Sequence, residues 1–303
     1  MHLLTLGGTQ FLGRHVVEIA RERGHDVTLF HRGQTGAELF PDAERILGDR
    51  RQHLARLEGR RFDAVIDLCG YTPADVAASA RALSPLADAY LFVSSLSTLA
   101  DLSTRGQNED APLAQLPPDA DPDVVTGEHY GALKALCEQA AREHFDGRVL
   151  VIRPGLIVGP HDPTDRFTWW PRRMGQSGEL LVPPLNQPVQ FLDARDLAHW
   201  MVRLLEAHIE GTVSAAGPRR PMVLGELVRL CADVLGTDPT LVEVSDAFLL
   251  EHDVAPFVEL PLWVPPDSVG LLDVDLTATW ARPSPTPIAG MPRDRLTRRS
   301  TQA

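Results

Sequence analysis

Cysteine and long apolar runs are scarce in this sequence of 303 residues, and each scarcity excludes something. The three cysteines, Cys69, Cys137 and Cys231, lie far apart and form no CxxC or Cys/His pattern. We therefore expect reduced thiols, no disulfide framework and no metal site. No basic segment followed by a long apolar run occurs after Met1. We therefore expect no signal peptide and no membrane span. The protein is expected to be cytoplasmic.

Positive charge is also in short supply. The net charge is −12, and the basic residues form no dense cluster before the C-terminus. Because an acidic chain repels phosphate backbones, nucleic acid is not an expected partner. With 44% hydrophobic and 23% charged residues, the composition is that of an ordinary globular protein.

Lysine is the rarest charged residue: of the 29 Lys and Arg residues, only Lys134 is a lysine. It follows Tyr130, one of three tyrosines, by four positions. On a helix these positions share one face, so the phenol and the ammonium would project together. The ammonium is expected to lower the pKa of the phenol from about 10, which gives an acid/base group usable near neutral pH. The alternative is a surface Tyr beside a solvated Lys.

Short apolar runs alternate with amphipathic stretches in the first half of the chain, as in βαβ units with a doubly wound parallel sheet. The expected strands are residues 2–6, 26–30, 64–67, 90–94 and 148–153. The expected helices are 11–23, 73–83, 127–145, 196–207, with Asp196 as N-cap, and 221–235. Residues 160–188 are rich in Pro, Gly and Trp and predict a long functional loop or small insertion.

A glycine-rich segment joins the first expected strand to the first helix: Gly7-Gly8-Thr9-Gln10-Phe11-Leu12-Gly13. At this position of a Rossmann-like fold, backbone N–H groups and a helix N-terminus bind a dinucleotide pyrophosphate. Gln10 replaces the middle glycine, and its Cβ restricts how closely the backbone approaches the phosphates, although Gly8 can supply room. A tight turn without a ligand is the alternative.

The residues after the second strand bear on which dinucleotide binds. His31 and Arg32 stand where NAD-binding folds usually place a carboxylate for the ribose 2′-hydroxyl. A guanidinium can instead bind a 2′-phosphate bidentately, so Arg32 favours NADP(H) over NAD(H), unless it is merely a solvated loop arginine. Asp49 follows Gly48 after a further expected strand that lies between those at 26–30 and 64–67, and it could accept from the adenine amino group or cap a helix.

Three features occur in order: the Gly7/Gly8/Gly13 loop, Ser94-Ser95 ending a buried strand, and Tyr130-xxx-Lys134 on a helix. Together they resemble the short-chain dehydrogenase/reductase superfamily, in its extended or atypical, NAD-dependent epimerase/dehydratase-like branch. Leu150-Val-Ile-Arg-Pro154, Val158-Gly-Pro160 and Phe191-Leu-Asp-Ala-Arg-Asp-Leu-Ala198 are similar to later segments of that branch. The resemblance covers roughly residues 1–275.

The resemblance implies roles for single residues. Tyr130 becomes the acid/base, Lys134 holds the nicotinamide ribose, and Ser95 binds the reacting oxygen. Ser95 is preferred to Ser94 because that branch usually has its active hydroxyl four residues before a Tyr, where this chain has Leu99. Further cofactor contacts are expected at Leu68, Cys69, Ser94 and Arg153.

Two departures from the family pattern matter. Leu96-Ser97 stands in place of the Asp-Glu pair of sugar-nucleotide 4,6-dehydratases, which argues against dehydration. Asp67-Leu-Cys-Gly70 stands where many members have a His-x-Ala-Ala type segment.

The resemblance thus predicts an oxidoreductase that transfers hydride between a nicotinamide dinucleotide, NADP(H) in preference to NAD(H), and a small-molecule carbonyl or alcohol. One alternative is a nucleotide-sugar epimerase that retains NAD⁺, and another is a non-enzymatic relative with a binding role. A homodimer is expected by family analogy alone. Candidate substrate contacts are His161, Arg166, Trp169 and Trp170, each with packing or surface pairing as its alternative.

The expected domain division follows a change in composition and hydrophobic periodicity along the chain. Residues 1–155 and 189–212 are expected to form the dinucleotide-binding domain. Residues 156–188 and 213–280 would form a smaller α+β substrate-binding part, with 281–303 as a tail.

Overall fold

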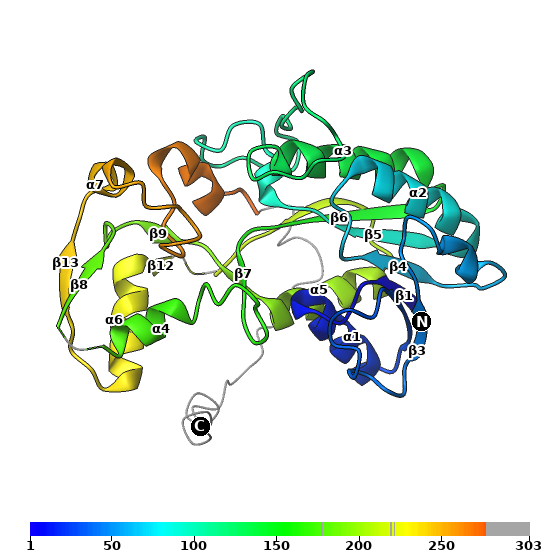
Figure 1. Ribbon diagram of the computed structural model, residues 1–303, viewed down its shortest axis with the longest axis horizontal. Helices are drawn as coiled ribbons and strands as arrows, with labels where there is room; N and C mark the ends of the chain where they lie inside the picture. Colours follow the sequence, from blue (N-terminus) through cyan, green and yellow to red (C-terminus); the bar gives the residue numbers. More distant parts are fainter. Residues whose placement is uncertain (177, 219, 221, 277–303) are drawn as a thin grey trace.

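The computed structural model describes residues 1–276 except 177, 219 and 221, so the expected tail at 281–303 lies outside the described residues (Figure 1). A seven-stranded sheet, in the order β11-β6-β5-β4-β1-β2-β3, forms its centre, and every pairing in it is parallel. The strands are β1 His2–Leu6, β2 Asp26–His31, β3 Glu44–Leu47, β4 Ala64–Asp67, β5 Ala89–Val93, β6 Arg148–Pro154 and β11 Gly211–Ala215. This arrangement confirms the predicted Rossmann-like, doubly wound fold.

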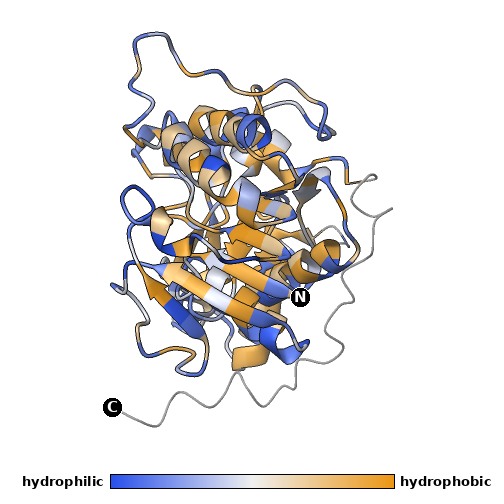
Figure 2. Ribbon diagram, turned by 90° about the vertical axis from the view of Figure 1, so that its right-hand side faces the viewer, coloured by the Kyte–Doolittle hydropathy of each residue, from blue (hydrophilic) through white to orange (hydrophobic). Residues whose placement is uncertain are grey.

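Helices cover both faces of the sheet. Helices α1 (Phe11–Glu22) and α5 (Ala194–Glu206) pack together on one face, and α2 (Pro73–Leu83) and α3 (Tyr130–His144) on the other. Successive strand residues point to opposite faces, so both must be apolar. Leu3 enters the core under α1 and α5, while Leu4 enters the core under α2 and α3. Figure 2 accordingly shows the strands as largely hydrophobic.

A smaller part lies beyond the carboxyl ends of the strands (Figure 1). Its core contains the fully buried Trp170 and Trp263. Its helices are α4 Trp169–Met174, α6 Leu224–Leu235 and α7 Asp246–Glu251. Its strand pairs are β8 Glu179–Val182 with β13 Thr240–Glu243, and β9 Pro188–Val189 with β12 Met222–Val223. The pair of β7 Ile157–Val158 with β10 Leu192–Asp193 lies between the two parts.

Short 3-10 turns complete the secondary structure. They are η1 Leu54–Leu57, η2 Ser84–Leu86, η3 Leu96–Thr98 and η4 Pro266–Leu272. No helix within the described ranges is both long and apolar enough to span a bilayer.

Some element boundaries differ from those predicted. Residues 160–188 contain α4 and β8, because Trp170 and alternate residues of β8 are buried in the smaller part. Helix α5 begins at Ala194, and Asp193 is its N-cap in place of Asp196, since the Asp193 carboxylate accepts the N–H of Arg195 at 2.8 Å. The central sheet includes β11 to Ala215, so the boundary expected at residue 212 falls inside a strand.

Candidate functional site

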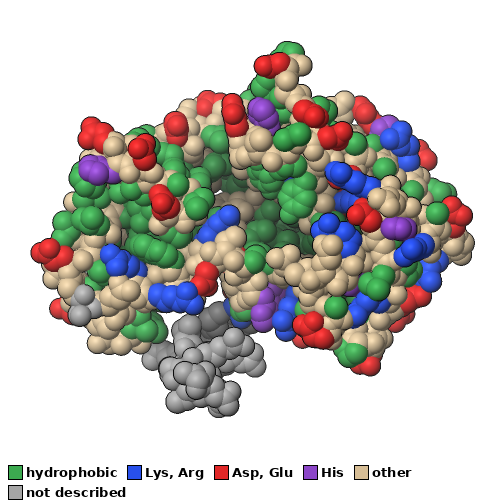
Figure 3. All heavy atoms as spheres, in the orientation of Figure 1, with side chains coloured by type: hydrophobic (Ala, Val, Ile, Leu, Met, Phe, Trp, Pro, Cys, Tyr) green, Lys and Arg blue, Asp and Glu red, His purple; other side chains and the backbone are tan. Residues whose placement is uncertain are grey.

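A cleft of about 1420 Å³ runs along the carboxyl ends of the central strands, between the sheet and the smaller part. Figure 3 shows it as a hollow with hydrophobic side chains on its floor. Ligands of doubly wound sheets bind in this crevice. Loops at residues 7–13, 31–35 and 48–51 line what we name the nucleotide end. Residues 96–102, 162–166 and 256–272 contribute to the opposite, substrate end.

The glycine loop has the close backbone packing expected of a phosphate-binding turn. Gly7 and Gly8 have φ values of +96° and +105°, which glycine adopts readily. A Cβ on Gly13 would stand 2.9 Å from the Cα of Gly8. The exposed Gln10 is extended and precedes α1, whose first N–H groups have no intrahelical partner. Gln10 therefore leaves the backbone open to a pyrophosphate, and the loop fits one.

The end of β2 brings two predicted residues to the cleft. The His31 Nδ1 accepts the N–H of Gly33 at 3.0 Å, and burial together with the charge of Arg45 lowers the pKa of His31. This ring is therefore neutral at physiological pH. Arg32 is exposed beside it and makes no hydrogen bond or ion pair with any residue in the described ranges. A solvent-facing guanidinium at this point suits a 2′-phosphate.

Asp49 follows β3 at the rim of the same end. One of its oxygens accepts the N–H of Arg51 at 2.8 Å, and its carbonyl accepts from Gln52 and His53. The residue therefore stabilises its own turn while it lines the cleft. Both roles weighed for Asp49 at the sequence level remain compatible with this position.

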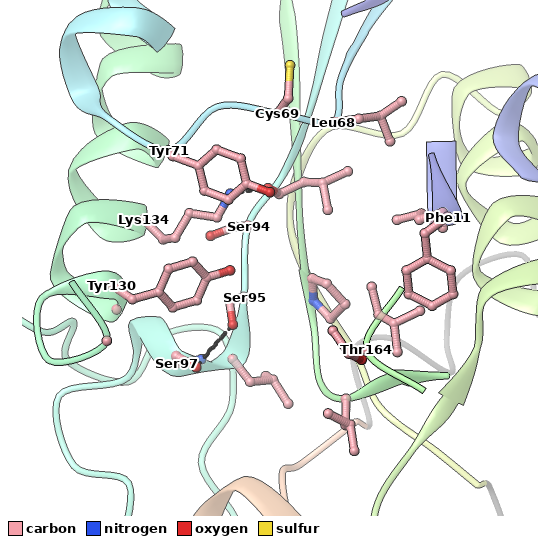
Figure 4. A pocket seen from close by; sticks show the side chains of 18 of the residues that line it. Phe11, Leu68, Cys69, Tyr71, Ser94, Ser95, Ser97, Tyr130, Lys134 and Thr164 are labelled. Carbon is pink, nitrogen blue, oxygen red and sulfur yellow. Dashed lines mark hydrogen bonds between the residues drawn. The ribbon is translucent and has the colours of Figure 1, made fainter. Parts of the chain in front are cut away.

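Tyr130 and Ser95 meet in the middle of the cleft (Figure 4). Tyr130 is the first residue of α3, and Ser95 follows β5 as the N-cap of η3. The Ser95 hydroxyl donates to the Ser97 hydroxyl at 3.2 Å, and the Ser95 side chain acts to lower the pKa of Tyr130. Ser95 also accepts the N–H of Ser97 at 3.1 Å, which fixes its hydroxyl at this place.

The predicted direction of the Tyr130 pKa shift was wrong. Burial raises the pKa of Tyr130 to about 12, with a further increase from Tyr71, and these outweigh Ser95 and the positive charge of Arg166. Desolvation disfavours the phenolate. Tyr130 is thus a phenol at neutral pH, a form that can donate a proton.

Lys134 is buried one turn further along α3, with Nζ donating to the carbonyls of Gly70 at 2.9 Å and Val93 at 2.7 Å. The ammonium also lies 4.5 Å from the ring centre of Phe92 and 5.2 Å from that of Tyr71. Burial lowers the pKa of Lys134 to about 8. A compact ammonium suits this enclosed place between carbonyls and rings, which rationalises the single lysine.

Arg153 is not among the described residues that line the cleft, whereas Ser94 is, and the side chains of both are bound to Glu138. The Arg153 guanidinium forms a buried bidentate pair with Glu138 on α3, at 2.9 and 2.7 Å. Ser94 donates to the same carboxylate at 2.6 Å. These contacts join β5, β6 and α3 beneath the cleft, so they support Tyr130 and Lys134 from behind. Of the two serines, Ser95 is the one that the fold directs to Tyr130.

Leu68 and Cys69 line the cleft after β4. Burial, followed by the charge of Asp67, raises the pKa of the Cys69 thiol to about 11, so the thiol is not an activated nucleophile. Beneath it, Arg50 forms a bidentate ion pair with the fully buried Asp67 at 2.9 and 2.6 Å. The Tyr90 hydroxyl donates to Asp67 at 2.6 Å. This network attaches the loop after β3 to the end of β4.

Sequence reasoning missed Tyr71. This half-exposed tyrosine lies in the cleft above Lys134 and near Tyr130 (Figure 4). Burial of its phenol raises the pKa of Tyr71 as well. Its only sequence signal was its place directly after the Asp67–Gly70 segment that departs from the family pattern.

The structure brings one of the four predicted substrate residues to the cleft, Arg166. His161 instead faces α1, with its ring centre 5.7 Å from that of His15. Trp170 is fully buried and donates its indole N–H to Pro261 at 2.8 Å, whereas Trp169 lines a separate hollow on the smaller part. Among the described residues, no group of three His, Cys, Asp or Glu side chains could hold a metal ion.

Comparison with known proteins identifies the family to which this chain belongs. The sequence pattern described as the NAD dependent epimerase/dehydratase family matches residues 3–216. The chain belongs to this family. It is an extended short-chain dehydrogenase/reductase, as the motifs predicted.

Individual relatives are distant. The epimerase family protein SDR39U1 of Bos taurus is 25% identical over 265 residues, covering 78% of this chain and 81% of that protein. The structure of human SDR39U1 (isoform 2) with NADPH has a TM-score of 0.59 at 21% identity, covering 90% of each chain. UDP-N-acetylglucosamine 4-epimerase from Bacillus cereus has a TM-score of 0.63 at 16% identity, covering 90% of this chain and 98% of that one. At these identities the two structures show the fold alone.

Proposed function

We propose that the protein is a reductase or dehydrogenase that transfers hydride between an exchangeable NADP(H) and the carbonyl or alcohol carbon of a small molecule. The observation that carries this proposal is the Ser95–Tyr130 pair with Lys134 behind it in one cleft. The cofactor, when bound, supplies the hydride chemistry. The cleft lies between two parts of the chain, and we propose that the sheet domain binds the nucleotide and the smaller part binds the substrate.

The chain's own residues would control the proton. Tyr130, protonated at neutral pH, donates to the carbonyl oxygen as reduction proceeds. The Ser95 hydroxyl stabilises the negative charge that develops on the same oxygen. Lys134 would hold the nicotinamide ribose, and Tyr71 would close the cleft above it. The glycine loop would hold the pyrophosphate.

Arg32 supports NADP(H) in preference to NAD(H), because an exposed cation with no partner among the described residues can bind a 2′-phosphate. A relative's structure with NADPH is consistent with this choice. An epimerase that retains NAD⁺ is the second candidate, favoured by the fold shared with a nucleotide-sugar epimerase. The predicted homodimer stays a prediction.

Net cofactor consumption and one variant test the proposal. With NADPH and a panel of aldehydes and ketones, the enzyme should oxidise NADPH stoichiometrically with alcohol formed. Tyr130→Phe removes only the donated proton and should lower kcat by about 10²–10⁴-fold with NADPH affinity unchanged. Near-normal turnover by Tyr130→Phe on a genuine substrate would refute the acid/base role. Epimerisation without net NADPH oxidation would favour the second candidate.

A further inference from the structure

Arg166 is a positive charge without a partner at the substrate end of the cleft. It is half-buried between β7 and α4 and makes no hydrogen bond or ion pair with any other described residue. Nearby arginines of the same part are paired: Arg172 binds Asp165 at 2.5 Å, and Arg173 donates to Gln176 at 2.6 Å. Withdrawing a charge from water costs free energy unless it is paired, so an unpaired arginine inside a cleft is suited to a ligand.

The positive charge of Arg166 influences Tyr130, the proposed proton donor. It is one of the influences on the pKa of Tyr130, which it lowers, so its field reaches the proposed proton donor. Thr164, two residues earlier, lies on the wall opposite Tyr130 in Figure 4. The carboxylate Asp162 also lines this end: its Oδ1 accepts the N–H and hydroxyl of Thr164 at 2.9 and 2.6 Å, and its Oδ2 is buried without a hydrogen-bond partner among the described residues. Glu128 is the other carboxylate here.

Many of the side chains that line the substrate end with Arg166 are apolar. One side comes from the segment after β5 and the other from the smaller part, which includes the exposed Val258. The apolar side chains that line this end include Leu96, Leu99, Leu102, Val258, Leu262 and Leu271. Among the described lining residues of the substrate end, Arg166 is the one arginine. This end therefore combines apolar side chains with one unpaired cation, Arg166, and two carboxylates, Asp162 and Glu128.

We propose that the substrate is a carbonyl compound or alcohol with an apolar body and one anionic group, a carboxylate, which Arg166 binds. This deepens the proposed function and rests on it for the identity of the reacting carbon. A guanidinium matches a carboxylate bidentately, and the apolar walls bury the body. Arg166 then sets which end of the molecule faces Tyr130, and it is a specificity-determining residue of this site.

A matched pair of probes tests the proposal. The complex of the enzyme with NADP⁺ is titrated by calorimetry with 4-carboxybenzaldehyde and with its methyl ester, which has the same body without the charge. The acid should bind about tenfold to a hundredfold more tightly than the ester, the range for a hydrogen bond to a charged group. Arg166→Gln should abolish this preference, and Arg166→Lys should keep part of it. Arg173→Gln, outside the cleft, is the matched control and should leave it unchanged.

Each other outcome overturns the proposal: equal affinity for acid and ester, a preference that survives Arg166→Gln, or no binding of either probe. A loss of NADP⁺ affinity in Arg166→Gln would also overturn it, because Arg166 would then bind the cofactor. The proposed function fails separately. If the acid preference depends on Arg166 but neither aldehyde nor any other carbonyl is reduced with NADPH, the anion site stands and the reductase does not.

Discussion

The glycine loop at the nucleotide end of the cleft is built from backbone and small side chains, whereas the substrate end is built from large side chains brought from distant segments. Residues 7–13, the expected phosphate-binding part of the nucleotide end, are one continuous turn after β1, beside the loops at residues 31–35 and 48–51. The second needs residues 96–102, 162–166 and 256–272 together. A binding site made of backbone groups depends on the conformation of a local turn, which tolerates few sequence changes. A side-chain site depends on the whole packing of the smaller part, so it can change with single substitutions.

The largest effect is expected beneath the nucleotide end, where Asp67 is fully buried against Arg50. Asp67→Asn leaves a buried guanidinium uncompensated, and breaking such a pair costs about 3–5 kcal/mol of unfolding free energy. Asp88→Asn, in an exposed pair with Arg61, is the control and should cost about 1 kcal/mol or less. Urea unfolding measures both. Equal effects would mean that the buried pair does not support this end.

A methyl group added to the glycine loop should affect ligand binding at the nucleotide end of the cleft. In Gly13→Ala the new Cβ would press on Gly8, and relieving that contact shifts backbone that faces the pyrophosphate. NADPH affinity should fall by about tenfold or more, since 1.4 kcal/mol is a factor of ten. Gly24→Ala is the control, because Gly24 lies outside the cleft and a Cβ there would meet no atom within 4 Å. Unchanged NADPH binding in Gly13→Ala would contradict the assignment of the loop.

Arg32 tests the choice between the two dinucleotides. Arg32→Ala should weaken NADPH binding by about tenfold, the lower range for a hydrogen bond to a charged group, and leave NADH binding unchanged. Arg21→Ala, on the outer side of α1, should change neither. If Arg32→Ala weakens both nucleotides equally, Arg32 contacts a group that they share.

The smallest effect concerns protons at Lys134. Its pKa is lowered to about 8 by burial, so just above that pH the free protein holds it mostly neutral. Binding an anionic cofactor favours the charged form, so NADPH binding at such pH should take up a proton. Calorimetry in buffers of different ionisation enthalpy measures this uptake, which should vanish in Lys134→Met. Uptake that persists in the variant would assign the proton to another group.

The sequence predicted most strands of the sheet and the turn at residues 7–13 because their signals are local, and it missed β11. The strands at residues 2–6 and 64–67 matched in full, since both faces of a parallel sheet require apolar residues. Helix α4 inside the predicted loop was missed, because its helical signal is short and Trp170 is helical through burial in the smaller part. The rise in the pKa of Tyr130 was also missed, since desolvation depends on neighbours such as Tyr71 that no spacing rule connects.

The identity of the nucleotide tests the central claim most directly. Freshly purified protein is denatured, any released nucleotide is identified, and the nucleotide-free protein is titrated with NADPH and NADH. We predict exchangeable NADPH binding with weaker NADH binding. Stoichiometric NAD⁺ released from the protein would contradict the reductase and point to an epimerase-type cycle. If neither nucleotide binds, the proposal that the protein is a nicotinamide-dependent enzyme is wrong.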